Sequence, residues 1–237
     1  MIFMGTLVNA VAIIAGALLG RLLTRIPESI RQTVMQGIGL AVILLGLQMG
    51  LGTKNFLIVI SSIVVGAIIG ELLGIDKGLN LAGQWLERKV GGSVQGSVAV
   101  GFVTATLVYC VGAMSVLGSL DSGLRNNHDI LFTKSLLDGF SAIIFTSTLG
   151  IGVLFSAIPV LLYQGGLVLL STQIYNLISP EMLDAILVEV TATGGVLIMA
   201  IGLNILELTK IKVANLLPAL LIAAMAVPIA ERLPGLI

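Results

Sequence analysis

Apolar segments long enough to cross a membrane follow one another along almost the whole chain. A helix needs about 20 apolar residues to span the hydrocarbon core of a bilayer. Eight segments of the 237-residue sequence meet this requirement: 2–23, 33–52, 55–74, 96–118, 133–155, 159–178, 183–207 and 213–231. The sequence therefore predicts an all-α polytopic membrane protein with about eight spans, or seven if Pro159 kinks one long helix instead of separating two.

The composition excludes several classes of function. Only 10% of the residues are charged and the formal net charge is zero, whereas soluble domains carry about 25% charged residues. We therefore expect the lipid bilayer as a partner and no nucleic acid. The single cysteine, Cys110, and the single histidine, His128, exclude a disulfide within the chain and clustered Cys or His metal ligands. Without a phosphate-binding loop or a Ser/His/Asp set, we expect no enzyme, no cofactor and no metal.

Residues 75–93 interrupt the apolar pattern. At helical spacing their apolar side chains share one face with Trp85, and most of their charges lie elsewhere. This pattern predicts an interfacial amphipathic helix over approximately 75–90; a lid or a partner-binding helix would look the same. We expect a single integral membrane domain over residues 1–237, with repeat-like halves at approximately 1–92 and 93–237.

The distribution of Lys and Arg predicts the orientation, because cytoplasmic loops carry an excess of these residues. With eight spans, one side would hold Arg21, Arg25, Arg31, Lys77, Arg88, Lys89, Lys210 and Lys212, and the other Lys54, Arg125, Lys134 and Arg232. The side with eight basic residues should be cytoplasmic and both termini extracytoplasmic. No basic segment precedes the first span, so we expect no cleavable signal and a multi-pass membrane protein.

Small residues recur every four positions in two spans, at Ala12, Gly16 and Gly20 and at Ser62, Gly66 and Gly70. Such stripes let helix backbones approach closely in membranes. We expect them to be close helix contacts that assemble a homodimer.

Three pairs of short motifs suggest inverted repeats. The segment from Gly39 to Gln48 and the segment from Gly195 to Asn204 both read Gly, six apolar residues, Gly, Leu and a carboxamide. Thr6-Leu-Val likewise matches Thr106-Leu-Val, and Gln36-Gly matches Asp138-Gly. Matched segments lie five or three spans apart and so cross in opposite directions. This architecture is typical of secondary transporters with a site at the membrane midplane.

The span at residues 102–123 is the best candidate for a cavity-lining helix. Thr106, Tyr109, Cys110 and Ala113 fall on one face at helical spacing, and Gly112 and Gly118 interrupt the helix. Polar groups in hydrocarbon need partners within the protein, so this face belongs in a bundle interior. The alternative is that its hydroxyls serve helix packing alone.

Two carboxylates lie inside predicted spans, Asp138 and Glu189. Ionisable groups in the membrane are costly and often functional, although Asp138 could instead lie at the interface within reach of Lys134. Glu71, Glu207 and Glu231 lie near span ends and are expected to be interfacial anchors. The candidate residues for binding a solute or ion are Thr104, Thr106, Tyr109, Cys110, Ser115, Asp138, Ser141, Gln36, Glu189, Thr193 and Asn204.

Three long stretches resemble a known family. TLVNAVAIIAGALLG, FVTATLVYCVGAMSVLGSLDSGL and TATGGVLIMAIGLNILELTKIKVANLLPAL are similar to the bacterial inner-membrane family catalogued as domain of unknown function 554. The resemblance covers nearly the whole chain and implies a membrane protein of the kind described as a transport protein, without a substrate or a mechanism.

These observations predict a secondary transporter of a small solute or ion, built from inverted repeats. Protons or Na⁺ could couple to transport through Asp138 or Glu189. The alternatives are a channel lined by the same polar helices, or a membrane scaffold in which the polar residues only pack.

Overall fold

The computed structural model describes residues 1–22, 28–78, 81 and 97–232, and in these residues the chain is helical without a β-strand. In this described part of the chain, seven helices are long and apolar enough to cross a membrane, and an eighth span is formed if a bent pair of helices counts as one. The predicted fold class is therefore confirmed. The expected interfacial helix at 75–90 lies mostly outside the described residues, which include its start at Ile75–Gly78.

The chain divides into two compact units, each built from two separate segments. Unit 1 contains residues 1–31 and 80–177, and unit 2 contains residues 32–79 and 178–237. This division differs from the expected halves 1–92 and 93–237, because the chain enters each unit twice.

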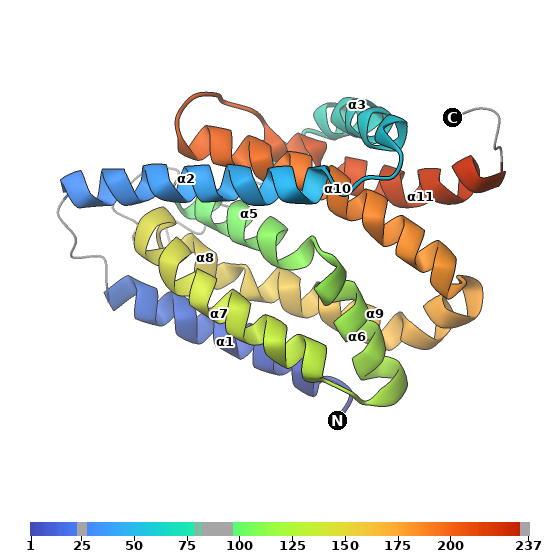
Figure 1. Cartoon of the computed structure of the whole chain (residues 1–237). Coiled ribbons are helices and arrows are strands. Elements are labelled where there is room, and N and C mark those ends of the chain that lie inside the picture. Colours follow the sequence, from blue (N-terminus) through green and yellow to red (C-terminus); the bar gives the residue numbers. More distant parts are fainter. Residues whose placement is uncertain (23–27, 79–80, 82–96, 233–237) are drawn as a thin grey trace. The chain divides into compact units, whose positions relative to one another are not determined.

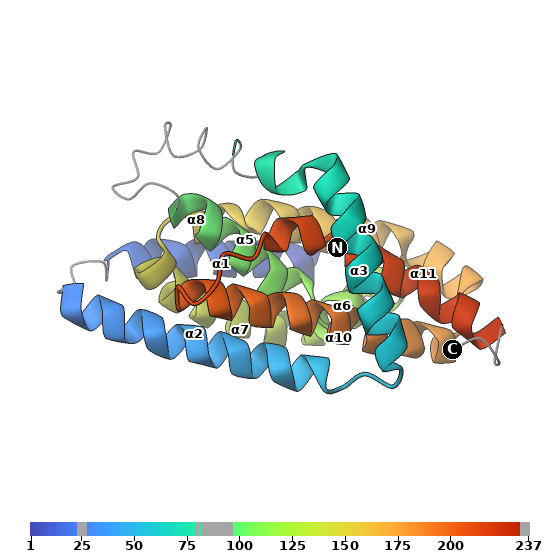
Figure 2. The same cartoon turned by 90° about the horizontal axis from the view of Figure 1, so that it is seen from above.

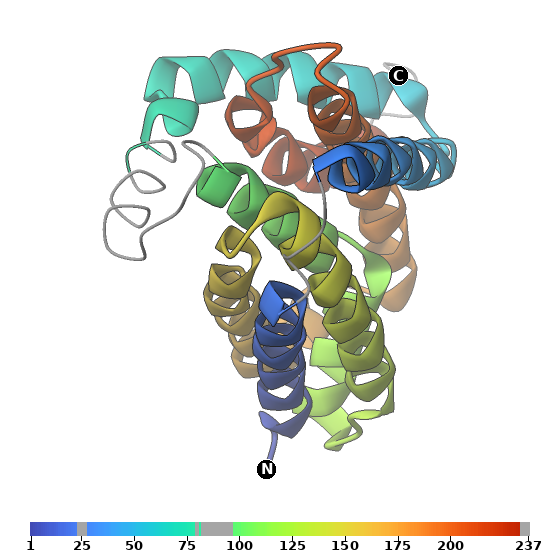
Figure 3. The same cartoon turned by 90° about the vertical axis from the view of Figure 1, so that its left-hand side faces the viewer.

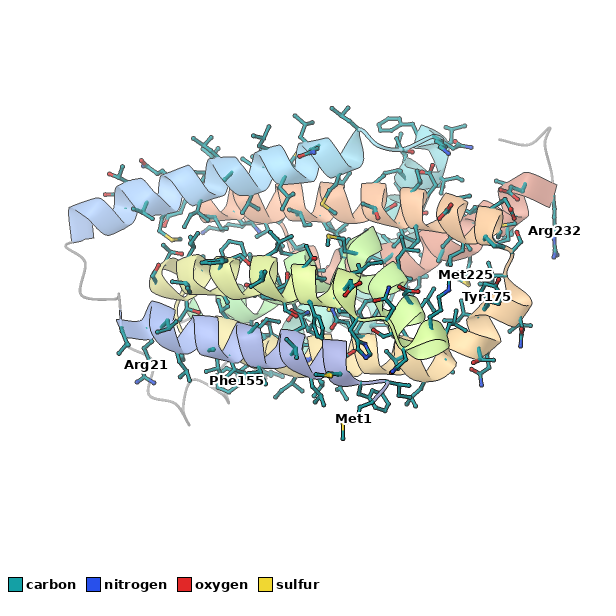
Figure 4. The ribbon with its side chains drawn as sticks, turned by 60° about the horizontal axis from the view of Figure 1, so that its bottom comes forward. Met1, Arg21, Phe155, Tyr175, Met225 and Arg232 are labelled. Atoms are coloured by element: carbon teal, nitrogen blue, oxygen red, sulfur yellow. The ribbon has the colours of Figure 1, made fainter. Side chains whose placement is uncertain are left out.

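The described residues of unit 1 contain five long helices and one short one, besides the first residues of α2 (Glu28–Gly50). They are α1 (Met4–Leu22), α5 (Ser97–Cys110), α6 (Ala113–Arg125), α7 (Asp129–Leu149), α8 (Gly152–Phe155) and α9 (Ala157–Leu177). The most extensive helix contact is between α1 and α7, which lie side by side in Figure 1. α1 also packs against α9 (Figure 3). In Figure 4, Met1 and Arg21 mark the two ends of α1, and Phe155 and Tyr175 lie near the two ends of α9.

Glycines bring α1 and α7 together in parallel. A methyl group at Gly16 would overlap the carbonyl oxygen of Gly139, and one at Gly20 would overlap that of Ile143. Near the start of both helices, Gly5 contacts Leu131. Because the contacts advance in the same direction along both helices, α1 and α7 are parallel.

Unit 2 contains α2 (Glu28–Gly50), which belongs to the unit from Gln32 on, α3 (Phe56–Leu73), α10 (Pro180–Ile205), the 3₁₀ helix η1 (Val213–Leu216) and α11 (Pro218–Arg232). α2 lies along α10, and α3 lies beside α11 (Figure 2). Within this unit, Ile58 of α3 forms a core cluster with Ala223 and Val227 of α11.

The glycine motifs that suggested a repeat pack against each other in unit 2. A methyl group at Gly46 would lie 2.5 Å from the carbonyl oxygen of Gly195, and one at Gly202 would lie 2.8 Å from that of Gly39. The contacts run in opposite directions along the two helices, so α2 and α10 are antiparallel. The matching motifs therefore form one self-complementary contact between two helices.

The two small-residue stripes are close helix contacts, as expected, but they are used within one chain. Gly16 and Gly20 pack on α7, and Gly66 and Gly70 pack on Ala219 and Asn215 of unit 2. The prediction that these stripes assemble a homodimer is therefore wrong, because both faces are already occupied. A homodimer through another surface stays a prediction.

The helix breaks differ from those expected around Gly118 and Pro159. The segment 102–123 breaks at Gly112, where φ is 150°, but α6 continues through Gly118. Ala113 lies beyond the break, so it does not continue the face of Thr106 and Tyr109. Span 5 ends at Leu149 because Gly150 has a φ of 90°, whereas Pro159 lies in the first turn of α9, where a missing N–H costs no helix bond.

Candidate functional site

Hydrogen bonds connect all five long helices of unit 1 in a closed ring. Asn9 Nδ2 of α1 donates to Asp138 Oδ2 of α7 at 3.0 Å and to Gln164 Oε1 of α9 at 3.3 Å. Gln164 Nε2 donates to Ser115 Oγ of α6 at 3.4 Å, and this hydroxyl donates to the backbone carbonyl of Tyr109 in α5 at 2.7 Å.

The ring closes through Ser141 on α7. Its hydroxyl oxygen lies 3.3 Å from the Tyr109 hydroxyl oxygen and donates to the backbone carbonyl of Asp138 at 3.0 Å. We call these six residues, Asn9, Tyr109, Ser115, Asp138, Ser141 and Gln164, the polar ring. All of them except the half-buried Ser141 are buried. Every member of the polar ring therefore has at least one hydrogen-bond partner inside the protein, as hydrocarbon surroundings favour.

An ion pair is attached to the polar ring at Asp138. Lys134 Nζ lies 2.9 Å from Asp138 Oδ1, and the two side chains are only 9% and 6% exposed. α7 begins at Asp129, before the predicted start of span 5 at residue 133, so Asp138 is the tenth of 21 residues in the helix. At about 1.5 Å of rise per residue, Asp138 lies near the middle of the helix.

Glycines explain why the Asn9 amide reaches this carboxylate. Gly139 directly follows Asp138, and its backbone is in contact with Ala12 and Gly16 of α1. A short polar side chain on α1 can therefore reach α7 without a long flexible arm. Asn9 is fully buried and lies one turn before Ile13 on the same face.

Two buried oxygens on α1 have no hydrogen-bond partner among the described residues. They are Asn9 Oδ1 and Thr6 Oγ1, and both side chains are 0% exposed. Residues three positions apart are neighbours on a helix face, so the two oxygens lie one turn apart on the buried face of α1. Leaving such groups unpaired costs free energy, and the hydroxyls of Ser62, Thr106, Thr146 and Thr193 are likewise buried without a partner among the described residues.

The break between α5 and α6 supplies further polar groups. The two helices meet at an angle of 59°, and Ser115 lies in the first turn of α6. Its hydroxyl accepts from Gln164 and satisfies a carbonyl at the end of α5. A discontinuous helix in a membrane is tolerated where it is buried in protein or lines a cavity.

Four of the predicted site residues come together in the polar ring: Tyr109, Ser115, Asp138 and Ser141. Thr104, Thr106 and Cys110 lie on the same helix as Tyr109 but outside the ring; Thr104 is buried and Cys110 is a free, half-buried thiol. Sequence reasoning missed Asn9, Gln164 and the burial of Lys134. The available signal for Asn9 was its position among small residues one and two turns away, at Gly5, Thr6 and Gly16.

Glu189 belongs to unit 2 and binds a turn. Its carboxylate accepts hydrogen bonds from the Thr53 hydroxyl at 2.6 Å, the Lys54 N–H at 2.8 Å and the Asn55 N–H at 3.0 Å. The side chain of Asn55 in turn caps α3 by accepting from the Leu57 N–H. Glu189 therefore holds the connection between α2 and α3.

The other predicted residues of unit 2 show no comparable cluster. The Asn204 amide bonds the loop after α10, through the Ile211 backbone and the Thr209 hydroxyl. Thr193 is buried and its hydroxyl has no partner among the described residues. Gln36 is exposed, whereas Asp138 is buried in unit 1. This placement does not support the expected symmetry between Gln36 and Asp138.

Glu71 anchors one end of unit 2 at the surface. It accepts from Lys212 Nζ at 2.8 Å and from the Asn215 amide, whose oxygen accepts from the Asp76 N–H. The hydrogen bond to Glu71 raises the pKa of Lys212. This agrees with the expected anchoring role of Glu71.

Comparison with known proteins decides the family. The family model "Protein of unknown function (DUF554)" matches residues 4–228. The chain belongs to this family. Within DUF554, it is 31% identical over 223 residues to the uncharacterized membrane protein YdfK of Bacillus subtilis, covering 92% of this chain and 93% of YdfK. It is 33% identical over 224 residues to the uncharacterized protein YqgA of Escherichia coli, covering 92% and 94%. No solved structure matches.

Proposed function

We propose that this membrane protein is a secondary transporter of a small solute or ion, with its site at the polar ring. The observation that supports this proposal is the buried ion pair Lys134–Asp138 in the middle of α7, which the polar ring joins to four other helices. Charged residues in the middle of a membrane are costly, and functional sites are where they are usually found.

The burial of the polar ring favours a carrier over a channel. Asn9, Tyr109 and Gln164 are each 0% exposed, so the site is closed from water. A carrier passes through such an occluded state, whereas a conducting channel needs a continuous polar path. The discontinuous helix α5–α6 is also typical of transporter binding sites.

The same proposal includes a cellular setting. We propose that the protein has no enzymatic activity, resides in the bacterial inner membrane and has both termini outside the cytoplasm. Lys134 lies inside α7, so it no longer counts as a loop residue. The proposed cytoplasmic side then holds eight basic residues against three on the opposite side, which strengthens the argument for this orientation.

A solute screen on purified protein tests the proposed function. A ligand that binds only the native state raises its apparent stability, so thermal unfolding should identify a solute, and proteoliposomes should take it up with saturation. Asp138→Asn should fold and lose both effects, because the amide cannot hold the Lys134 ammonium as a counterion.

The matched control is Asp121→Asn, which removes the carboxylate of an ion pair with the exposed Arg125 on α6. This variant should keep uptake. Unitary conductance in planar bilayers would instead indicate a channel. Wild-type uptake that Asp138→Asn leaves unchanged would contradict a site at the polar ring.

A further inference from the structure

We propose that the coupling ion of the transporter is a proton, which Asp138 takes up, and that the polar ring transmits this change to the break between α5 and α6. The inference rests on the proposed function and names the coupling ion of the same site. It starts from the direction of the hydrogen bonds in the polar ring, because that direction depends on the charge of a single residue.

The charge of Asp138 determines which way the hydrogen bonds of the polar ring point. An ionised carboxylate only accepts hydrogen bonds, so Asn9 presents its Nδ2 group to Oδ2. The same Nδ2 group donates to Gln164 Oε1, so Gln164 presents its Nε2 group to the Ser115 hydroxyl. That hydroxyl then donates to the backbone carbonyl of Tyr109. One chain of donors, which we call the relay, therefore runs from Asn9 beside the carboxylate to the end of α5.

A proton on Asp138 belongs on Oδ2. The other oxygen, Oδ1, lies 2.9 Å from the Lys134 ammonium, and an ammonium group can only donate. Oδ2 faces Asn9, whose carboxamide carries both donors and an acceptor. A buried O–H without an acceptor costs free energy, so the Asn9 carboxamide turns over and presents Oδ1. Its two ends have nearly the same shape, so this rotation needs no additional space.

The reversal of Asn9 reverses the rest of the relay. Gln164 turns over as well, so that its Nε2 group donates to Asn9 Oδ1 and its Oε1 atom faces the Ser115 hydroxyl. A hydroxyl carries one hydrogen, so Ser115 then donates to Gln164 and no longer to the Tyr109 carbonyl. Protonation of one carboxylate on α7 therefore removes a hydrogen bond at the end of α5.

The hydrogen bond from Ser115 to Tyr109 bridges the break between α5 and α6 (Figure 1). Carbonyl groups in the last turn of a helix have no partner within the helix, and Tyr109 is the second-last residue of α5. Gly112 follows α5 with a φ of 150°, and a methyl group added there would meet no described atom within 4 Å. Packing at Gly112 therefore does not fix the 59° angle between the helices, and loss of the hydrogen bond allows this angle to change.

Proton uptake also makes the closed site unfavourable. The Lys134 ammonium loses its counterion when Asp138 is protonated, and an unpaired charge in an apolar interior is costly. Water that enters when the α5–α6 angle changes can solvate the ammonium. The protonated protein therefore favours an open site and the ionised protein favours the occluded one. One proton is bound on opening and released on closing, and this couples the proton to the transport cycle.

Other titratable groups lie on the helices around Asp138 and directly before α7. They are the Met1 amino group and Arg21 beside or on α1, Tyr109 and Cys110 on α5, Asp121 and Arg125 on α6, Tyr163 and Tyr175 on α9, and His128 and Asp129 at the start of α7. α8 carries none. Asp129 is exposed, and Asp121 pairs with an exposed arginine. The His128 ring is half-buried and bonded to the Ser122 hydroxyl, so its titration needs a control.

Spin labels and infrared spectroscopy on purified full-length protein test the relay. In a Cys110→Ala background, labels at Val100→Cys on α5 and Leu124→Cys on α6, both exposed positions, report the distance across the break. Acidification should produce a second distance, whose population relative to the first rises about tenfold per pH unit because one proton is bound. The carboxylic acid band of Asp138 should appear at the same midpoint. Asp138→Asn should lose both the band and the pH dependence of the distance.

Gln164→Met separates the relay from the proton site. The methionine side chain is similar in length but has no carboxamide, so this variant should keep the Asp138 band and lose the second distance. Gln173→Met, an exposed change on the same helix, is the matched control and should behave like the wild type. His128→Asn should keep both pH effects, because His128 lies outside the relay.

Ser115→Ala tests the last step of the relay. Without a hydroxyl donor for the Tyr109 carbonyl, this variant should show the acidic distance already at neutral pH. Ser119→Ala is the matched control, because the Ser119 hydroxyl donates to a backbone carbonyl within α6 and does not reach the break. This control should keep the distances of the wild type.

The wild-type measurements decide the question even where a variant does not fold. A single distance at every pH, or a second distance whose midpoint differs from that of the Asp138 band, would overturn the inference. So would a pH response of the distance that Gln164→Met keeps or that His128→Asn loses. Solute uptake that ignores a proton gradient would overturn this inference but leave the transporter intact. A working relay in a protein that takes up no solute would contradict the transporter alone.

Discussion

Asp138 and Glu189 are both buried carboxylates, but their partners give them different roles. Asp138 pairs with the Lys134 ammonium on its own helix and accepts a hydrogen bond from the Asn9 amide on α1. Glu189 instead accepts from a hydroxyl and two backbone N–H groups of one turn. Backbone donors are fixed in place by the chain itself, so Glu189 defines the geometry of the α2–α3 connection. We therefore expect a substitution at Glu189 to lower the stability of the protein and a substitution at Asp138 to lower transport.

Glu189→Gln should destabilise the protein by about 1–3 kcal/mol, because hydrogen bonds to a charged acceptor are stronger than those to a neutral one. Uptake per folded molecule should be unchanged. Thermal unfolding and a transport assay measure the two effects, and Asp184→Asn, an exposed change on the same helix, is the control. Normal stability with lost uptake would instead place Glu189 in the transport site.

Single polar residues within apolar runs were the hardest to interpret from the sequence. Asn9 interrupts an otherwise apolar span, and nothing local distinguishes a hydrogen-bonded hub from a packing residue. Lys134 is counted with the extracytoplasmic basic residues because a span that starts at residue 133 puts it at the membrane edge, whereas α7 begins at Asp129. Glu189 and Asn204 were predicted to line a binding site. In the structure they accept hydrogen bonds from backbone groups of loops, and residue types alone do not reveal such partners.

At the scale of helices, the contact between α2 and α10 has no room for side chains at its glycines. Gly46→Ala should destabilise unit 2 by about 1–3 kcal/mol, the usual cost of overpacking, since the new methyl group would lie 2.5 Å from the Gly195 carbonyl oxygen. Thermal unfolding in detergent measures the effect.

Gly37→Ala is the matched control on the same helix. A methyl group there meets nothing within 4 Å, and alanine favours a helix over glycine by about 1 kcal/mol. This variant should be neutral or slightly stabilised. Equal effects of the two substitutions would show that the backbone, and not the helix contact, determines the cost at Gly46.

Helix existence was predictable because about 20 consecutive apolar residues have few alternatives in a membrane. Helix ends were less predictable at Pro159 and Gly150. Both residue types interrupt helices, but proline is tolerated in the first turn and glycine adopts the positive φ that ends α7. The pairing of Gly39–Gly46 with Gly195–Gly202 was visible as a repeated motif, although the sequence could not show that the two copies contact each other.

At the scale of the whole molecule, the distribution of basic residues predicts the side of the membrane on which each loop lies. In a Cys110→Ala background, an impermeant thiol reagent added to intact cells should label Arg232→Cys. Lys77→Cys, also at an exposed position, should be labelled only after permeabilisation, because the excess of basic residues predicts that its loop lies on the cytoplasmic side. The opposite pattern would invert the topology.

The double entry of the chain into each unit determines the order of assembly during synthesis. Asn9 precedes Asp138 by 129 residues, and ribosomes add about 5–20 residues per second, so Asn9 has no carboxylate partner for roughly 6–26 s. α2 likewise precedes α10, and its glycine face stays uncovered until that helix is made. Neither unit can be completed early, so biogenesis must protect one polar amide and one bare helix face until late in translation.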